Sequence, residues 1–261
     1  MVIALSMADA EEWVTDEQLW TESYASMFPA QSFEAARHEV EQIVELTGCR
    51  AGSVLDLACG PGRHAVPFAR RGFAVTAVDR TRFLLDKARE RAAAEGVDVE
   101  WIERDMREPS RPAAFDLCIC MYTSFGVFEE HAENQRVLDN VHRSLRPGAA
   151  FVVDVAGKEI LARIWQPTAS SQLDDGRVFI QRREVVDDWS RIEMEWLYLR
   201  GNEVSYSKRI RHWIYSAREL RAMLETAGFS DITIYGDLTG APYGPAAKRL
   251  IAVARVPPGP P

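Results

Sequence analysis

The sequence has no apolar run long enough to cross a membrane, so we expect no membrane partner. Its opening apolar stretch, residues 2–5, is short and lacks the basic flank of a secretion signal. Cysteine is also scarce: the four residues, at positions 49, 59, 118 and 120, show no spacing typical of a zinc site. Because free, partly buried thiols are typical of a reducing compartment, we expect a cytoplasmic protein.

Basic residues are also fewer than acidic ones. There are 31 Lys and Arg residues against 39 Asp and Glu residues, which gives a formal net charge of −8 at pH 7. An acidic balance opposes binding to a phosphate backbone, so nucleic acid is not an expected partner. The densest basic run, residues 208–211, is interpreted as a solvated strand face, with contact to an anionic substrate as the alternative. With 261 residues, 47% of them hydrophobic, the chain can form one substantial domain with a small appended part.

What the sequence does have is a glycine turn that follows a buried strand. Residues 54–57 are apolar apart from Asp56, and residues 59–64 (CGPGRH) follow as a turn and the start of a helix. Gly60 and Gly62 lack a Cβ atom, so the backbone there can turn sharply and approach a ligand closely. We expect Asp56 to act mostly by holding this turn in shape.

Two further strands end in acids at the same edge of the predicted sheet. Residues 74–78 precede Asp79, whose carboxylate can accept hydrogen bonds from both hydroxyls of a ribose. Residues 99–103 precede Asp105, which can accept from an exocyclic amine, and Met106, whose N–H can donate to a ring nitrogen. These successive acids suit a ligand with a cation and a ribose better than a polyphosphate.

These motifs resemble those of class I S-adenosylmethionine-dependent methyltransferases of the small-molecule type. The resembling segments, in chain order, are 56–62, Asp79, 105–106, 115–122, 145–149 and 249–255. The resemblance implies an α/β fold with a Rossmann-like, mostly parallel seven-stranded sheet and helices on both faces. It also implies the cofactor S-adenosylmethionine, with S-adenosylhomocysteine as its product. The cofactor-binding residues that we expect are Asp56, Ala58, Gly60, Gly62, Arg63, Asp79, Arg80, Asp105, Met106, Met121 and Tyr24.

A dinucleotide site is the main rival interpretation of the glycine turn. Residues 60–65 also fit the G-x-G-x-x-A pattern, with Asp79 near its expected place. A dinucleotide site does not need Asp56 or the 105–106 pair. A site for adenosylmethionine is expected to have them, and this cofactor has no pyrophosphate to place on a helix N-terminus. As a blander alternative, Asp56 and Asp105 act only as caps and turn formers.

An aromatic helix face precedes the expected core. Trp20, Tyr24 and Phe28 recur every four residues, which places them on one face of a helix. This face either packs on the core or belongs to a lid over the cofactor. Further helices are expected over residues 32–47, 81–95, 131–145 and 216–227.

A change of pattern follows the fifth expected strand. Residues 176–186, 190–200 and 203–214 alternate as an inserted antiparallel three-stranded meander. Met194 and Trp196 lie on an aromatic face of its middle strand, which either packs against the domain or walls a substrate pocket.

The expected organisation of the chain has four parts. Residues 1–165 form N-terminal lid helices and the cofactor-binding core, and residues 166–213 form the β insertion, a substrate cap or dimer contact. Residues 214–255 complete the core, and residues 256–261 are a disordered tail.

The predicted reaction transfers a methyl group to an oxygen, nitrogen or carbon nucleophile of a small-molecule acceptor by in-line displacement. The candidates for a general base are Tyr122, Ser124, His131 and His212, with His64 and Tyr206 as further ones. We see no set of paired acids that would hold a metal ion. An RNA or protein methyltransferase and a non-catalytic cofactor-binding module are the alternatives. The sequence leaves open the acceptor and the oligomeric state, for which a homodimer is one option.

Overall fold

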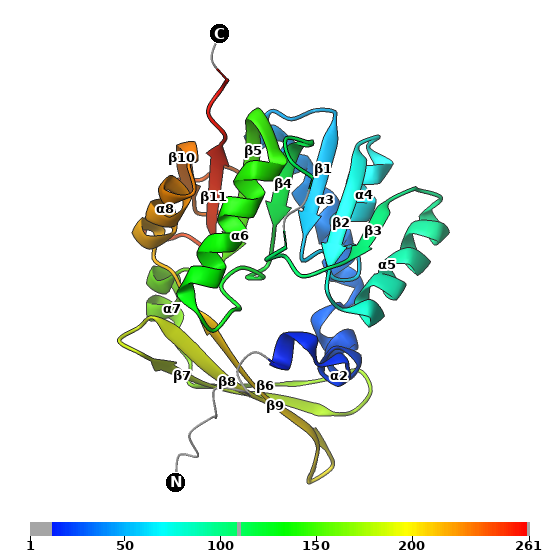
Figure 1. The fold of residues 1–261 in the computed structure, drawn as a ribbon. Helices are drawn as coiled ribbons and strands as arrows, with labels where there is room; N and C mark the ends of the chain where they lie inside the picture. The colour runs from blue at the N-terminus through cyan, green and yellow to red at the C-terminus, as the bar shows by residue number, and fades with distance from the viewer. Residues whose placement is uncertain (1–11, 109–110, 260–261) are drawn as a thin grey trace.

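A seven-stranded sheet forms the centre of the computed structural model, which describes residues 12–108 and 111–259 (Figure 1). The strand order is β10-β11-β5-β4-β1-β2-β3. β11 pairs antiparallel with β5 and β10, and the other neighbouring strands pair in parallel. The strands are β1 (Ser53–Leu57), β2 (Ala74–Asp79), β3 (Glu100–Glu103), β4 (Phe115–Cys120), β5 (Leu145–Val155), β10 (Ser230–Tyr235) and β11 (Leu250–Arg255). This arrangement confirms the predicted fold class.

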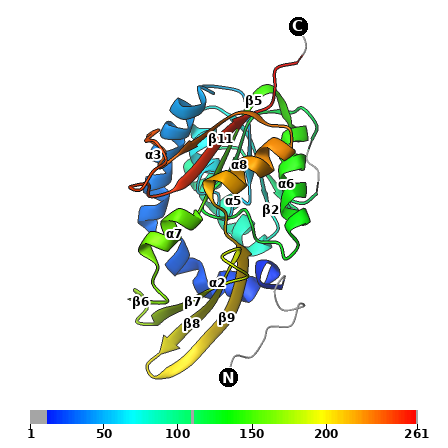
Figure 2. The same ribbon diagram turned by 90° about the vertical axis from the view of Figure 1, so that its left-hand side faces the viewer.

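Helices cover both faces of this sheet because its central strands are apolar on both sides. Successive strand residues point to opposite faces: Leu117 packs in one core cluster with α3, α4 and α5, and Cys118 packs in the other with α6 and α8. Figure 2 shows α3 and α6 on opposite sides of the sheet. The helices are α3 (Ala30–Thr47), α4 (Ala65–Arg70), α5 (Arg82–Glu95), α6 (His131–Ser144), α7 (Lys158–Ile164) and α8 (Ala217–Thr226).

Local signals explain where several helices begin and end. Ser216 and Glu219 form a capping box at the start of α8, with each side chain bonded to the other residue's backbone. Gly96 ends α5 in the left-handed conformation, with φ of 65°, that glycine adopts without strain.

A second, four-stranded antiparallel sheet follows α7. Its strands, in spatial order, are β6 (Thr168–Gln172), β7 (Val178–Val186), β8 (Arg191–Arg200) and β9 (Glu203–Trp213). The last three strands correspond to the predicted meander, and the structure has one strand more than the three that the sequence predicted. The additional strand, β6, is an edge strand of mostly exposed small and polar residues, and it therefore carries no alternating apolar pattern.

The second sheet and the N-terminal helices lie at one end of the core sheet. Figures 1 and 2 show β6–β9 below the core, with α2 (Glu17–Met27) beside them. The short helix η1 (Glu12–Thr15) precedes α2 and contacts β9. We call η1, α2 and strands β6–β9 the cap. Tyr206 in β9 donates a hydrogen bond at 3.3 Å to Asp16, which caps α2, so both parts of the cap are joined.

The C-terminal chain stays ordered just past β11. Val256, where the sequence suggested that a disordered tail begins, is buried and exchanges backbone hydrogen bonds with Ala149 and Gly148. Residues 257–259 are exposed and irregular. Residues 1–11 and 260–261, on which part of the lid and tail expectations fall, lie outside the described residues. Within the described part of the chain, no helix is long and apolar enough to span a membrane.

Candidate active site

A cavity of about 320 Å³ lies between the carboxyl ends of the core strands and the cap. Loops after β1 to β4 form its core side, a placement that open parallel sheets favour for ligands. The core-side residues are Asp56, Ala58, Cys59, Gly60, Arg63, His64, Val78, Asp79, Arg80, Thr81, Leu84, Arg104, Asp105, Met106, Met121, Tyr122, Thr123, Ser124, Val127 and Phe128. The cap-side residues are Trp13, Val14, Trp20, Met27, Phe28, Met194, Trp196, Ile210 and His212.

Asp79 ties the glycine turn to the end of β2. One of its carboxylate oxygens accepts a hydrogen bond from the Gly60 N–H, and the other accepts from the Thr81 N–H, both at 2.8 Å. Burial raises the pKa of Asp79, although these backbone donors oppose the rise. The turn itself needs glycine at position 60, where φ is +54°.

Asp56 lies under the same turn with one oxygen unsatisfied. The side chain is buried, and its Oδ2 atom has no hydrogen-bond partner. Burial, together with the neighbouring charge of Asp79, raises the pKa of Asp56 to about 8. The turn therefore holds a carboxyl group whose charge depends on what binds beside it.

Asp105 and Met106 both line the cavity after β3. The Asp105 carboxylate is held by the guanidinium of Arg107 at 2.9 Å and that of Arg80 at 3.2 Å. Burial alone would raise the pKa of Asp105, but the hydrogen bonds from Arg107 and the charge of Arg80 hold it below its usual value. Asp105 thus stays ionised as an acceptor at the rim of the cavity.

Two of the expected cofactor residues do not line the cavity. Gly62 packs against the core, because a Cβ atom there would meet the Trp101 ring at 2.8 Å and Ala88 at 3.1 Å. The ring of Tyr24 packs against Phe28 and Phe83, with centroid distances of 5.5 and 5.6 Å. The other nine expected residues are brought together around the cavity.

Some of the candidate bases line the cavity and others do not. Tyr122, Ser124, His64 and His212 line the cavity, whereas His131 and Tyr206 do not. His131 packs edge-on against the ring of Trp213 at 5.0 Å, and the Tyr206 hydroxyl is bonded to Asp16.

A network of buried charges that sequence reasoning missed holds Tyr122 in place. The Tyr122 hydroxyl donates to Glu39 at 2.8 Å, and Glu39 also bonds His64 at 2.9 Å and Arg249 at 2.6 Å. Arg249 in turn pairs with Asp154, whose carboxylate accepts from the Tyr122 N–H at 2.9 Å. The sequence signals for this network were Glu39 on the apolar face of α3 and Asp154 within the apolar strand β5.

This network sets the protonation of its members. Burial alone would raise the pKa of Glu39, but the hydrogen bond with His64 and the charge of Arg249 lower it to about 2. Burial and the hydrogen bond to Glu39 raise the pKa of Tyr122 to about 12. Tyr122 therefore keeps its proton at neutral pH, although its side chain is 42% exposed. The guanidinium of Arg63 lies over its ring, 3.6 Å from the centroid.

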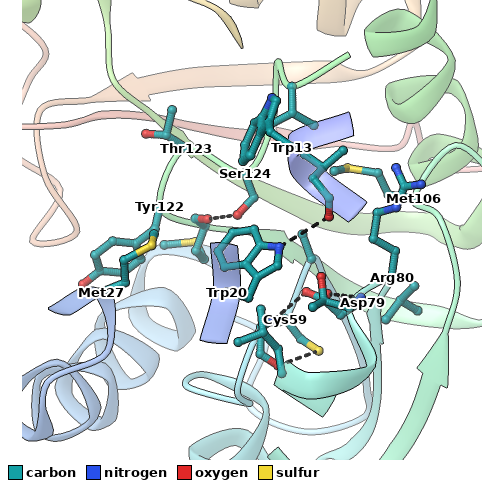
Figure 3. Close-up of a pocket in the computed structure, with 18 of the residues that line it drawn as sticks. Trp13, Trp20, Met27, Cys59, Asp79, Arg80, Met106, Tyr122, Thr123 and Ser124 are labelled. Atoms are coloured by element: carbon teal, nitrogen blue, oxygen red, sulfur yellow. Dashed lines mark hydrogen bonds between the residues drawn. The ribbon is translucent and has the colours of Figure 1, made fainter. Parts of the chain in front are cut away.

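The cap completes the cavity with aromatic side chains from both of its parts. Figure 3 shows Trp20 between Asp79 and Cys59 on one side and Trp13 and Ser124 on the other. The Trp20 indole N–H donates to the Val14 carbonyl at 3.4 Å. The aromatic helix face therefore both lines the cavity and packs on its surroundings.

The inserted sheet both walls the cavity and packs against the domain, the two roles that its sequence left open. Met194 and Trp196 of β8 face the cavity, whereas Tyr198 is buried in the core cluster and stacks on Phe179 at 4.7 Å.

Similarity to known proteins agrees with this geometry. Residues 54–148 match the model of a methyltransferase domain family. A putative methyltransferase of Geobacillus is 25% identical over 209 residues, which cover 78% of this chain and 85% of that protein.

Solved structures share the fold at lower identity. An S-adenosylmethionine-dependent methyltransferase from Clostridium acetobutylicum superposes with a TM-score of 0.74 at 14% identity, covering 92% of this chain and 97% of the other. A cofactor-bound amino pentose methyltransferase from Micromonospora echinaspora has a TM-score of 0.65 at 21% identity, with 98% and 99% covered. The predicted resemblance is confirmed: the protein is an S-adenosylmethionine-dependent methyltransferase with the class I fold.

Proposed function

We propose that this enzyme transfers the methyl group of S-adenosylmethionine to a nucleophile of a small molecule held between the core sheet and the cap. The observation that carries the proposal is the two-sided cavity. Its core side presents Asp56, Asp79 and Asp105, and its cap side is almost entirely apolar. A volume of about 320 Å³ is that of a small-ligand site. The amino pentose methyltransferase with the same fold supports a small acceptor.

The core side fits the cofactor's chemical groups. Asp79 retains lone pairs beyond those used by Gly60 and Thr81, so it can accept from ribose hydroxyls. Asp105 and the Met106 N–H suit the edge of an adenine. The unsatisfied Asp56 oxygen is an acceptor for a cationic group, and Arg63, whose Nε has no partner, is a cation for a carboxylate.

The cofactor, when bound, supplies an electrophilic methyl group, so the protein's task is mainly to align the acceptor and exclude water. Residues 166–213 together with η1 and α2 serve this task by covering the edge of the sheet. An RNA or protein acceptor would need an open, basic or peptide-binding surface, and a cavity lined on one side by the cap disfavours it. Cytoplasmic localisation and a homodimer stay predictions, and light scattering tests the second.

The proposal is tested by screening a metabolite library for release of S-adenosylhomocysteine. We expect turnover with one class of small molecules, and much less with the same library and an Asp79→Ala variant at the same cofactor concentration. If the enzyme binds S-adenosylhomocysteine but methylates only peptides or RNA, the small-molecule assignment is wrong. Cofactor binding without turnover of any acceptor would favour the binding-module alternative.

A further inference from the structure

The cap side of the cavity offers a ligand almost no charge. Within the described chain, its lining residues include no Asp, Glu, Lys or Arg, and His212 is the one ionisable group. The carboxylates that line the cavity are all on the core side: Asp56 lies in β1, Asp79 ends β2 and Asp105 follows β3. A protonated amine facing the cap would therefore be buried without a counter-charge, which is unfavourable.

Two hydrogen-bond donors on the cap side are left without partners. The side chains of Trp13 and Trp196 are 7% and 8% exposed, and neither indole N–H has a hydrogen-bond acceptor. Trp20 differs, because its indole N–H is bonded to the Val14 carbonyl. Buried donors are usually satisfied. Both indole nitrogens are themselves enclosed, so an oxygen acceptor of a ligand reaches them once the aromatic side chains around them move apart.

The orientation of His212 fixes which ring nitrogen carries its proton. Its Nδ1 lies 3.0 Å from the Trp213 carbonyl oxygen, which can only accept a hydrogen bond. In the neutral ring the proton is therefore on Nδ1, and Nε2 keeps a lone pair. Nε2 makes no hydrogen bond within the described chain.

The surroundings of His212 keep this ring neutral. Burial lowers its pKa, and the Trp213 carbonyl only partly opposes this. The charged residues of the adjacent strands project to the opposite sheet face by alternation. There Arg211 pairs with Glu193 at 3.2 Å and with Glu129 at 3.1 Å, and Arg191 also pairs with Glu129.

The other candidate bases lie on the core side of the cavity wall, and the side chain of each makes a hydrogen bond. The Ser124 hydroxyl donates to the Met121 carbonyl at 2.8 Å, and the Tyr122 hydroxyl donates to Glu39. His64 is bonded to Glu39 and follows the glycine turn on the core side. His212 is the candidate base on the cap side of the cavity.

We propose that His212 is the general base of this methyltransferase and that the acceptor is an uncharged aromatic molecule carrying the reacting hydroxyl group. The inference rests on the proposed function and names its substrate class. A second oxygen of the acceptor, such as a ring carbonyl, accepts hydrogen bonds from Trp13 and Trp196 and thereby orients the ring.

The acceptor oxygen forms a bond to the methyl carbon while the bond between that carbon and sulfur breaks. The electron pair of the broken bond stays on sulfur, which leaves as the neutral thioether of S-adenosylhomocysteine. The hydroxyl proton passes to Nε2 of His212, and the resulting imidazolium releases it to water.

The substrate class is tested with a panel of hydroxycoumarins, hydroxyflavones and hydroxyquinones, by measuring S-adenosylhomocysteine release. The comparison compounds are the amino analogues of the same ring systems and a set of amino sugars. We expect turnover of hydroxyl compounds, and at least about tenfold lower kcat/KM for their amino analogues. Turnover of amino sugars only, or of no aromatic compound although S-adenosylhomocysteine binds, would overturn the inference. If S-adenosylhomocysteine itself does not bind, the proposed function fails first.

The role of His212 is tested with His212→Asn, with His38→Asn on the exposed face of α3 as the matched control. His212→Asn should lower kcat about 100-fold or more, with the affinity for S-adenosylhomocysteine unchanged. The wild-type rate should fall at acidic pH as His212 becomes protonated, and the variant should lose that acidic limb. A variant with wild-type kcat and the same pH profile would refute the assignment.

The indole donors are tested with Trp196→Phe, which keeps an aromatic ring but removes the N–H. We expect KM for the hydroxyl acceptor to rise about tenfold, with S-adenosylhomocysteine binding unchanged. An unchanged KM would show that the acceptor makes no hydrogen bond to Trp196.

Discussion

Replacing Asp79 by alanine should affect cofactor affinity and stability separately. The carboxylate lies at the end of β2, inside the cavity, and each oxygen also accepts a backbone N–H. Two charge-assisted hydrogen bonds to a ribose, shared with these donors, should contribute about 2–4 kcal/mol to binding. The affinity for S-adenosylhomocysteine should therefore fall about 30- to 1000-fold in calorimetry.

The same substitution leaves the N–H groups of Gly60 and Thr81 without their acceptor. We expect the free energy of unfolding to fall by about 1–3 kcal/mol, measured by urea denaturation without ligand. Asp86→Ala, which removes an exposed carboxylate on α5 bonded to Arg89, is the matched control and should change neither quantity. Wild-type affinity in a folded Asp79→Ala variant would refute the placement of the ribose.

Three further predictions concern the turn, its buried acid and the cap. Gly60→Val should abolish binding of S-adenosylhomocysteine, since φ is +54° and a branched side chain would project toward Phe28; retained binding in calorimetry would place the ligand elsewhere. The folded pKa of Asp56, about 8, lies above its usual 3.8, so the protonated form favours folding and the ligand-free enzyme should lose stability as the pH rises between these values. Asp56→Asn should remove a slope of up to about 1.4 kcal/mol per pH unit in urea unfolding, and an identical slope in the variant would contradict this. Amide exchange in residues 12–28 should slow when S-adenosylhomocysteine binds; exchange that is slow and unresponsive would show that the segment only packs on the core.

The core sheet and its cofactor edge could be predicted because the necessary signals are local. The short strands that have Asp56, Asp79 and Asp105 at or just beyond their ends can each be recognised within a few residues, and so can the turn built on Gly60. Gly62 belongs to the same motif, yet its contact with Trp101 depends on how α5 and β3 pack. Its packing role could not be read from the turn alone.

The features that escaped prediction depend on residues far apart in the sequence. Glu39, Tyr122, Asp154 and Arg249 come together only when α3, β4, β5 and β11 are assembled. Strand β6 lacks an apolar alternation because both of its faces are largely exposed. The choice among the candidate bases likewise depends on the folded structure, which places His212 beside the Trp213 carbonyl and on the cavity wall.

The most direct test of the account is a crystal structure of the enzyme with S-adenosylhomocysteine. We predict that the ribose binds at Asp79, that the adenine lies beside Asp105 and Met106, and that the sulfur faces Trp196 and His212 on the cap side of the cavity. A ligand bound outside this cavity, or one whose sulfur points away from the cap, would contradict the account.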